Sequence, residues 1–301
     1  MTHLLAVGLG YCGRALIAAA PHLFNRVTGT SRSAAGAGRI SDLSRLGLEA
    51  HGLVFDGTDL PRDLEAAIAQ ADILLLSAPP GPAGDPLMAV ARAALDAAPK
   101  LRQVIYLTTL GVYGDHGGAW VDETTPLNPG SERLERRIAA EADWLAFGAQ
   151  KGIPVASLRL AGIYGPGRNA LLNLKDGDAR RIDKPGQVFN RIHVDDISAA
   201  IEAVIAHGFS GILNVTDDLP APPGDPVAHA AHLMGREPPP LLPFAEAAKT
   251  MSPMALTFWA GNKRVRNAVL KDRLGVILRY PTYREGLDAL FAQGEGQTPT
   301  G

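Results

Sequence analysis

The residues of this chain best suited to a chemical task are three glycines near its start. Gly8, Gly10 and Gly13 form a G-x-G-x-x-G motif between an apolar run at residues 4–7 and an expected helix over residues 14–20. In a strand–turn–helix unit, such glycines permit the tight turn, the approach of a diphosphate to the backbone, and close packing of helix on strand. The helix start favours an anion. The motif therefore predicts a dinucleotide site, with an ordinary glycine turn as the alternative while it stands alone.

The residues after the second expected strand bear on which dinucleotide would bind. Folds that prefer NAD place an acidic side chain about 20 residues after the glycines, where it binds the ribose 2′-hydroxyl. Residues 28–33 hold no Asp or Glu. Arg32 instead offers a planar fork to a 2′-phosphate, assisted by the hydroxyls of Thr30 and Ser31. The sequence thus predicts NADP over NAD, and a solvated surface charge is the alternative role of Arg32.

Further cofactor contacts are expected at the ends of the next two strands. Asp56 is expected to accept a hydrogen bond from the adenine amino group, whereas Asp59 is expected to cap the helix that starts near Leu60. Small residues and prolines after the fourth strand, beginning with Ala78 and Pro79, leave room for a flat ring system. The predicted cofactor-binding residues are Gly8, Gly10, Tyr11, Cys12, Gly13, Ser31, Arg32, Asp56, Ala78 and Pro79.

The elements that must position these residues alternate regularly along the first half of the chain. Short apolar runs typical of buried parallel strands alternate with amphipathic helices, which predicts an α/β fold with a Rossmann-like doubly wound parallel sheet. The expected strands are residues 4–7, 26–29, 49–55, 73–77, 103–108 and 154–160. The expected helices are residues 14–20, 41–46, 60–70, 86–97 and 133–149.

The second half loses this rhythm after residue 165. Segments rich in Pro and Gly separate short expected helices at residues 196–207, 226–234, 262–274 and 284–292. We expect a dinucleotide-binding domain over residues 1–165 with contributions from about 188–216, a smaller substrate-capping lobe over 166–293, and a disordered tail over 294–301. His193 is expected to help hold the two lobes together, and Asp195 and Asp196 are expected to cap the following helix.

The composition excludes several classes of function. The 301 residues are 46% hydrophobic and 20% charged with a net charge of −2, so nothing calls for nucleic acid or an anionic membrane as a partner. The single cysteine, Cys12, excludes an internal disulfide, and no His/Cys/Asp cluster has the spacing of a metal site. The apolar runs are too short to span a bilayer and the start leaves no room for a signal peptide. We therefore expect a soluble cytoplasmic protein.

Five motifs after the glycine turn recur in an order that carries a family resemblance. They are TTLGVYG at residues 108–114, DETTP at 122–126, LRL with IYGPG at 158–160 and 163–167, RIHVDD at 191–196, and GILNV at 211–215. The set resembles the extended short-chain dehydrogenase/reductase superfamily of the NAD-dependent epimerase/dehydratase type, over nearly the whole chain. The resemblance implies an NAD(P)-binding oxidoreductase or epimerase, in which Thr109 matches the family's catalytic Ser.

The chain departs from this family at the proton-transfer pair. The family's Tyr-x-x-x-Lys usually stands eight and four residues before a helix Glu, and relative to Glu141 these places hold Arg133 and Arg137. A shift by one residue also supplies neither a Tyr nor a Lys. Arginine has a pKa above 12 and does not exchange protons at neutral pH. The family's sugar-contacting Asn also falls at Gly162. The resemblance therefore implies a non-standard arrangement for proton transfer.

Several residues are candidates to replace that pair. Tyr113 lies at the carboxyl end of the fifth expected strand, where Rossmann-like sheets place substrate, and is predicted to transfer the proton while Thr109 holds the substrate oxygen. Tyr164, in the loop after strand six, and His116, in a glycine-flanked loop, are further candidates. Structural packing is the alternative for both tyrosines, and a solvated imidazole is the alternative for His116.

Cationic residues point to an anionic small-molecule substrate such as a nucleotide sugar. For Arg133 and Arg137, i,i+4 ion pairs on a solvated face are the default expectation. The functional alternative is that one of them binds a phosphate or carboxylate of the substrate. Cations beside aromatics at residues 262–267 and 280–287 are a second place to hold such a ligand. An enzyme of this type is the first hypothesis, and a catalytically inactive NAD(P)-binding sensor or regulatory protein is the second. The charged helix around Arg133 gives no reason to expect a dimer.

Overall fold

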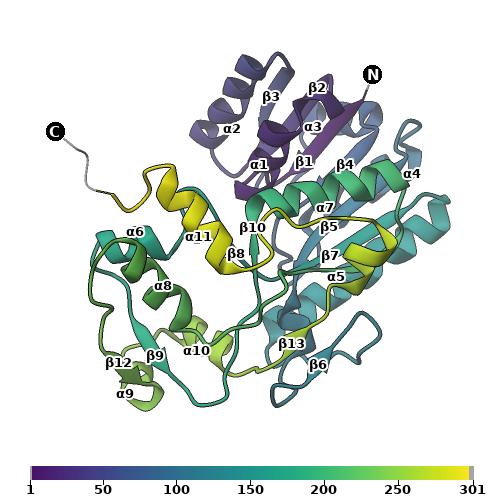
Figure 1. Ribbon diagram of the computed structural model, residues 1–301. Coiled ribbons are helices and arrows are strands. Elements are labelled where there is room, and N and C mark those ends of the chain that lie inside the picture. The colour runs from purple at the N-terminus through teal and green to yellow at the C-terminus, as the bar shows by residue number, and fades with distance from the viewer. Residues whose placement is uncertain (1, 298–301) are drawn as a thin grey trace.

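A seven-stranded sheet forms the centre of the computed structural model, which describes residues 2–297 (Figure 1). Its strands are β1 (His3–Val7), β2 (Arg26–Ser31), β3 (Glu49–Val54), β4 (Ile73–Leu76), β5 (Gln103–Thr109), β7 (Val155–Leu160) and β11 (Gly211–Val215). They are all parallel, in the order β11-β7-β5-β4-β1-β2-β3. The order reverses between β1 and β4, where such sheets bind ligands at the carboxyl ends of the strands. The predicted Rossmann-like doubly wound sheet is confirmed.

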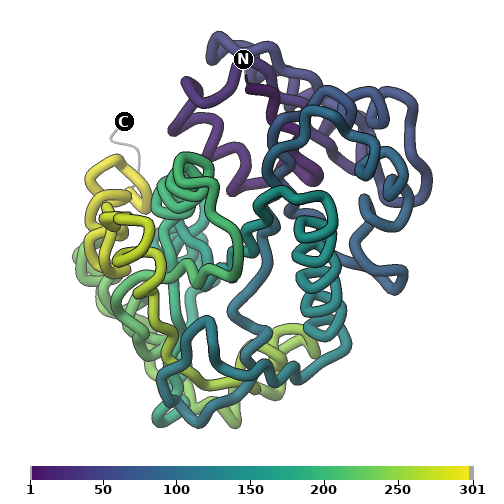
Figure 2. The backbone as a smooth tube through the Cα atoms, turned by 90° about the vertical axis from the view of Figure 1, so that its right-hand side faces the viewer, coloured from purple at the N-terminus to yellow at the C-terminus, as the bar shows by residue number. Residues whose placement is uncertain are grey.

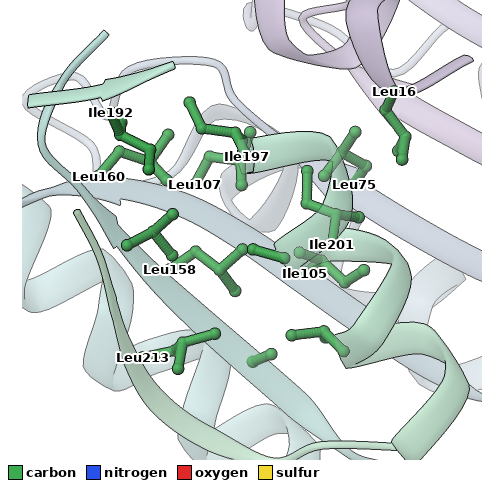
Figure 3. Close-up of a cluster of buried hydrophobic side chains, with 14 of the residues drawn as sticks. Leu16, Leu75, Ile105, Leu107, Leu158, Leu160, Ile192, Ile197, Ile201 and Leu213 are labelled. Atoms are coloured by element: carbon green, nitrogen blue, oxygen red, sulfur yellow. The ribbon is translucent and has the colours of Figure 1, made fainter. Parts of the chain in front are cut away.

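Helices cover both faces of this sheet, which explains why its central strands are buried apolar runs. One face carries α1 (Tyr11–Ala19), α2 (Ala34–Ser41) and α7 (Val194–His207), and the other carries α3 (Arg62–Gln70), α4 (Pro86–Ala97) and α5 (Glu132–Lys151). Ile197 and Ile201 of α7 share one buried cluster with Ile105 and Leu158 of the sheet (Figure 3). The predicted helix over residues 86–97 matches α4 in both bounds.

A smaller lobe lies to one side of the sheet, away from β3 and α2 (Figures 1 and 2). It contains α6 (Ala170–Lys175), β9 (Arg181–Asp183), α8 (Asp225–Leu233), β12 (Leu241–Pro243), α9 (Phe244–Ala248), α10 (Pro253–Trp259) and α11 (Tyr283–Ala292). Its own core includes Leu171, Ala230 and Leu287. The parallel pair β8 (Gly162–Tyr164) and β10 (Arg191–His193) connects this lobe to the sheet.

Two helices differ from the sequence prediction. The helix expected at residues 41–46 is a 3-10 turn, and α2 precedes it. Ser33 starts α2 by accepting a hydrogen bond from the Gly36 N–H, whereas the sequence Ala-Ala-Gly-Ala-Gly gives little helical periodicity. The helix expected at residues 262–274 is replaced by β13 (Arg264–Val265), which pairs with β6 (Trp120–Val121), and a π-helical turn at Val269–Arg273. The Asn190 side chain imposes this extended path because it binds the backbone of Lys263 and Val265.

The last segments also differ from expectation. Leu270, Leu274 and Leu278 are buried in the cluster beneath α7, so part of the expected lobe packs on the sheet. Residues 294–297, predicted to belong to the disordered tail, form a turn in which Glu295 accepts a hydrogen bond from the Gly167 N–H. Residues 298–301 of that expected tail lie outside the described residues. Between residues 2 and 297, no helix combines the length and apolar character needed to cross a membrane.

Candidate functional site

The glycine loop is fixed between three strands of the sheet. Gly8 has a φ of +81°, and a Cβ at this position would lie 2.9 Å from the backbone nitrogen of Ala78. The Gly8 N–H donates to Thr30 Oγ1 at 2.9 Å, and the Ser77 hydroxyl donates to the Gly8 carbonyl at 2.5 Å. Only glycine combines this backbone conformation with this close approach. The loop is therefore shaped before any ligand arrives.

The start of α1 presents the donors that an anion requires. The helix is preceded by Gly10, and no side chain in the described part of the chain caps its first N–H groups. A Cβ on Gly13 would press into a neighbouring leucine side chain, so this glycine allows close packing. Burial raises the pKa of the Cys12 thiol, which stays protonated here. The Tyr11 hydroxyl donates to the Pro166 carbonyl at 2.9 Å and so ties the loop to the lobe.

The other predicted cofactor residues lie along the same edge of the sheet. Arg32 is exposed at the end of β2, and no carboxylate within residues 2–297 lies at ion-pair distance from it. Ser31 is half-buried against the start of α2. Asp56 is exposed, and its carboxylate accepts hydrogen bonds from Thr58, which lower its pKa. Exposed Pro79 follows β4. The glycine cradle, the uncapped helix and this edge together fit a dinucleotide.

Two expected helix caps are wrong. Asp59 does not cap α3, because that helix begins at Arg62 after Pro61 and lacks a side-chain cap among the described residues. Asp196 likewise does not cap α7. Its buried carboxylate instead accepts the backbone N–H groups of Arg279 and Tyr280, and thus fixes the chain that returns to the sheet.

A cavity of about 880 Å³ lies between the carboxyl ends of β5 and β7, the start of α5 and the lobe. Most of its wall is apolar, yet four cationic side chains and one carboxylate contribute to it. These charged residues are Arg133, Arg168, Arg191, Lys263 and Asp115. A cavity of this size and mixed lining is typical of a small-molecule site. Its charge balance favours an anionic occupant.

Thr109 lies in the wall of this cavity, as the family resemblance implies. Its Oγ1 accepts a hydrogen bond from the Gly111 N–H at 3.1 Å, which starts the 3-10 turn Leu110–Tyr113. A threonine hydroxyl that accepts one hydrogen bond still has its own hydrogen to donate. Thr109 is therefore placed to hold a substrate oxygen.

Tyr113 does not reach the cavity, and its placement argues against the predicted role in proton transfer. It is fully buried, its hydroxyl donates to Asn214 Oδ1 at 2.8 Å, and the Arg159 guanidinium lies 4.9 Å from its ring centroid. Burial also raises the pKa of the phenol, which opposes proton exchange at neutral pH. Tyr113 is a packing residue between β5 and β11.

The guanidinium beside Tyr113 belongs to a buried ion pair that fixes α5. Arg159 on β7 donates to both carboxylate oxygens of Glu141 on α5, and the Ser157 hydroxyl donates to the same carboxylate at 2.7 Å. Both ion-pair partners are at least 95% buried. This contact determines which face of α5 turns toward the cavity.

The three arginines near the start of α5 have different surroundings. Arg136 pairs with Glu132 on the helix surface, as an i,i+4 pair should. Arg137 is partly buried beneath the helix beside Tyr106, and burial lowers its pKa. Arg133 lines the cavity with its guanidinium 5.7 Å from the ring centroid of Phe258 on α10. Of the two predicted anion-binding arginines, the structure therefore brings only Arg133 to the cavity.

Lys263 is the cavity residue that the sequence did not single out from its basic cluster. Its Nζ donates to the Gly114 carbonyl at 2.9 Å in the cavity wall. Burial lowers its pKa to about 8, and the Asp115 carboxylate opposes part of that shift. Neighbouring Arg264 and Arg266 turn away, toward the Gly118 carbonyl and the Trp120 ring. Lys263 can therefore exchange a proton near neutral pH, which an arginine cannot.

The lowered pKa of Lys263 predicts a pH dependence of stability. Between about pH 8 and pH 10 the folded protein holds Lys263 neutral, whereas the unfolded chain still protonates it. The unfolded state then binds more protons, so the free energy of unfolding rises with pH over this range. Urea denaturation should show that Lys263→Met removes this rise, whereas Lys100→Met, an exposed control, keeps it. The same rise in wild type and Lys263→Met would contradict the assignment.

Three further candidates have structural partners. The Tyr164 hydroxyl donates to the Thr282 carbonyl at 3.3 Å, and burial raises its pKa, although the ring lines the cavity. His193 accepts the Asp195 N–H at Nδ1 and starts α7, and burial lowers its pKa to about 4. His116 contacts the Tyr113 carbonyl at 2.9 Å and is thus held, not freely solvated. The pKa shifts of Tyr164 and His193 oppose proton exchange at neutral pH.

Comparison with known proteins agrees with this architecture. The model of the NAD dependent epimerase/dehydratase family matches residues 86–216, which include β5, α5, β7 and β11. A solved structure of a functionally unknown conserved protein from Silicibacter pomeroyi DSS is 44% identical, with a TM-score of 0.85 over 98% of this chain and 100% of that one. Protein YeeZ of Escherichia coli K12 is 31% identical over 257 residues, 79% of this chain and 86% of that protein.

A third relative has a named activity. The 3-diazoavenalumate denitrifying reductase from a Streptomyces species is 30% identical over 183 residues, which are 56% of this chain and 58% of that protein. The sheet order, the glycine turn and the recurring motifs of this chain are consistent with these matches. This chain belongs to the NAD-dependent epimerase/dehydratase family.

Proposed function

We propose that this protein is an NADP-preferring oxidoreductase or epimerase that acts on an anionic small molecule by a non-standard proton-transfer arrangement. The observation that carries the proposal is the cavity at the carboxyl ends of β5 and β7, which Thr109, Arg133 and Lys263 all line. A protein that only senses a dinucleotide has little use for a second, cationic cavity of this size. Family membership and the relative named as a reductase support redox chemistry.

The residues of the cavity divide the work as follows in this proposal. The bound nicotinamide dinucleotide supplies the hydride donor or acceptor. Thr109 donates its hydroxyl hydrogen to the reacting substrate oxygen and so orients it. Arg133 binds the anionic group of the substrate, because it lines the cavity and its guanidinium can donate two parallel hydrogen bonds to a carboxylate or phosphate. Lys263 exchanges the proton that the family's usual tyrosine would exchange.

The residues that line the cavity indicate the class of substrate. The cations favour a phosphate or carboxylate, which includes a nucleotide sugar and a simple organic acid. Apolar residues such as Leu134, Ile163 and Phe258 provide most of the remaining surface. An anion with an apolar body therefore fits at least as well as a sugar.

The preference for NADP rests on Arg32, which has an exposed guanidinium and no carboxylate at ion-pair distance among residues 2–297. Arg32→Ala is expected to weaken NADPH binding about 10- to 100-fold, because a charged hydrogen bond contributes about 1.5–3 kcal/mol. NADH binding should stay within about 2-fold, since NADH has no 2′-phosphate. Fluorescence titration of both nucleotides measures this. Tighter binding of NADH than NADPH to the wild type would overturn the assignment.

The second candidate function is nucleotide sensing without turnover. One observation favours it: Arg133 and Arg137 occupy the places of the family's proton-transfer pair, which argues against the family's usual chemistry. The two candidates separate on a matched pair of variants. The assay uses a carboxylic acid with a carbonyl group that the wild type reduces with NADPH. Thr109→Val and Lys263→Met should each reduce the rate of this reaction and leave the affinity for NADPH unchanged. A sensor would show no turnover to lose and would respond to nucleotide in both variants alike.

A further inference from the structure

The loop Gly165–Arg168, which follows β8, reaches back from the lobe to the nucleotide edge. The Tyr11 hydroxyl at the start of α1 donates to the Pro166 carbonyl in this loop. A Cβ on Gly165 would lie 2.7 Å from the same Tyr11 oxygen, so the two segments touch. The loop thus contacts the side chain of Tyr11, the first residue of α1.

This loop has a fixed shape. Gly165 and Arg168 form a closed antiparallel bridge through two backbone hydrogen bonds of 3.0 Å. The Asn169 side chain donates to the Gly165 carbonyl at 3.0 Å, and Glu295 accepts the Gly167 N–H at 2.8 Å. Because the loop is already ordered, a side chain that it presents can bind a ligand without the entropic cost of ordering the loop backbone.

Arg168 is the charged residue that this loop presents. It is exposed, it lines the cavity, and no carboxylate in residues 2–297 lies at ion-pair distance from it. Burial raises the pKa of both Tyr11 and Cys12, and the positive charge of Arg168 opposes part of each shift, which places the guanidinium near the first turn of α1. In the sequence, Arg168 is marked only weakly, as an arginine in a Pro- and Gly-rich segment after a buried strand.

Resting on the proposed function, we propose that Arg168 binds the diphosphate of the dinucleotide from the lobe side, opposite the glycine loop. The diphosphate then lies between backbone N–H groups of one segment and a bidentate guanidinium of another. Both kinds of donor suit the same pair of phosphate oxygens. Arg168 is a binding and positioning residue that couples the lobe to the nucleotide.

The test uses the full chain and isothermal titration with NADPH, NADH and ADP-ribose. Arg168→Gln should weaken all three by a similar factor of about 10 to 100, because they share the diphosphate. Binding of adenosine 2′-monophosphate, which lacks the diphosphate, should not change. Arg168→Lys should recover part of the loss. Arg180→Gln, an exposed arginine elsewhere in the lobe, serves as the matched control. Thermal melting of each variant verifies folding.

The outcomes are distinct. Loss of NADPH affinity alone would mean that Arg168 contacts the 2′-phosphate, and unchanged affinity for all three ligands would mean that it contacts none of them. Either result overturns the proposal. If the wild type binds none of the three, the proposed function fails, and with it the basis of this inference. If NADH binds more tightly than NADPH but both lose equally on Arg168→Gln, the NADP preference fails and the role of Arg168 stands.

Discussion

The variant Glu141→Gln is expected to lose about 3–5 kcal/mol of its free energy of unfolding at pH 7. The substitution leaves the Arg159 guanidinium, 2% exposed, without a negative partner in the interior. A glutamine retains the shape and one acceptor for the Ser157 hydroxyl, so the loss comes from the uncompensated charge. Urea denaturation monitored by circular dichroism measures the change.

Two further variants test the cause of this loss. Glu135→Gln changes an exposed carboxylate on the same helix and should alter stability by less than about 0.5 kcal/mol. The double variant Glu141→Gln with Arg159→Met removes the stranded charge and should recover most of the stability. A loss below about 1 kcal/mol in Glu141→Gln, or no recovery in the double variant, would show that the ion pair does not stabilise α5.

Gly8→Ala is expected to reduce dinucleotide affinity by about 100-fold or more and to lower stability by about 1–3 kcal/mol. The added Cβ would meet the Ala78 backbone at 2.9 Å, in a conformation with φ of +81°. Neither the close contact nor the unfavourable backbone conformation can be relieved unless the loop moves. Loss of two charged hydrogen bonds from the loop to a diphosphate is about 3–6 kcal/mol. Titration with NADPH measures the affinity and thermal melting measures the stability.

Gly81→Ala is the matched control for this variant. It lies after β4 near the same edge, and a Cβ there would meet nothing within 4 Å. It should therefore bind NADPH like the wild type. Normal NADPH affinity in a folded Gly8→Ala protein would show that the nucleotide does not rest on this loop.

The sheet was predictable because each central strand is a short apolar run that needs no distant information. Helix α2 was not, because its start depends on the Ser33 cap and its residues are mostly small. The segment after Asn262 was mistaken for a helix because the side chain that extends it, Asn190, is far away in sequence. The local hydrophobic pattern predicts helices and strands that bury one face. It does not predict a segment whose backbone path depends on a side chain distant in sequence.

The site shows the same division. The glycine motif could be placed on a turn from neighbouring residues alone. The sequence left Tyr113 open between proton transfer and structural packing, because its burial depends on Asn214 and Arg159 on other strands. Lys263 could not be separated from its basic neighbours until the chain path showed which of them turns toward Gly114. The residues able to do chemistry could be identified from the sequence. The direction in which each side chain points could be read only from the structure.

The hydrogen bond from Tyr11 to Pro166 has a thermodynamic consequence. It joins the glycine loop to the loop Gly165–Arg168, which lies more than half the chain away in sequence and also lines the cavity. The dinucleotide site and the cavity therefore have this segment in common. A ligand that binds at the glycine loop therefore alters the binding free energy of a ligand in the cavity. By linkage, the coupling free energy is equal in both directions. Saturation with one ligand should thus shift the dissociation constant of its neighbour, and the order of addition should leave the final occupancy unchanged.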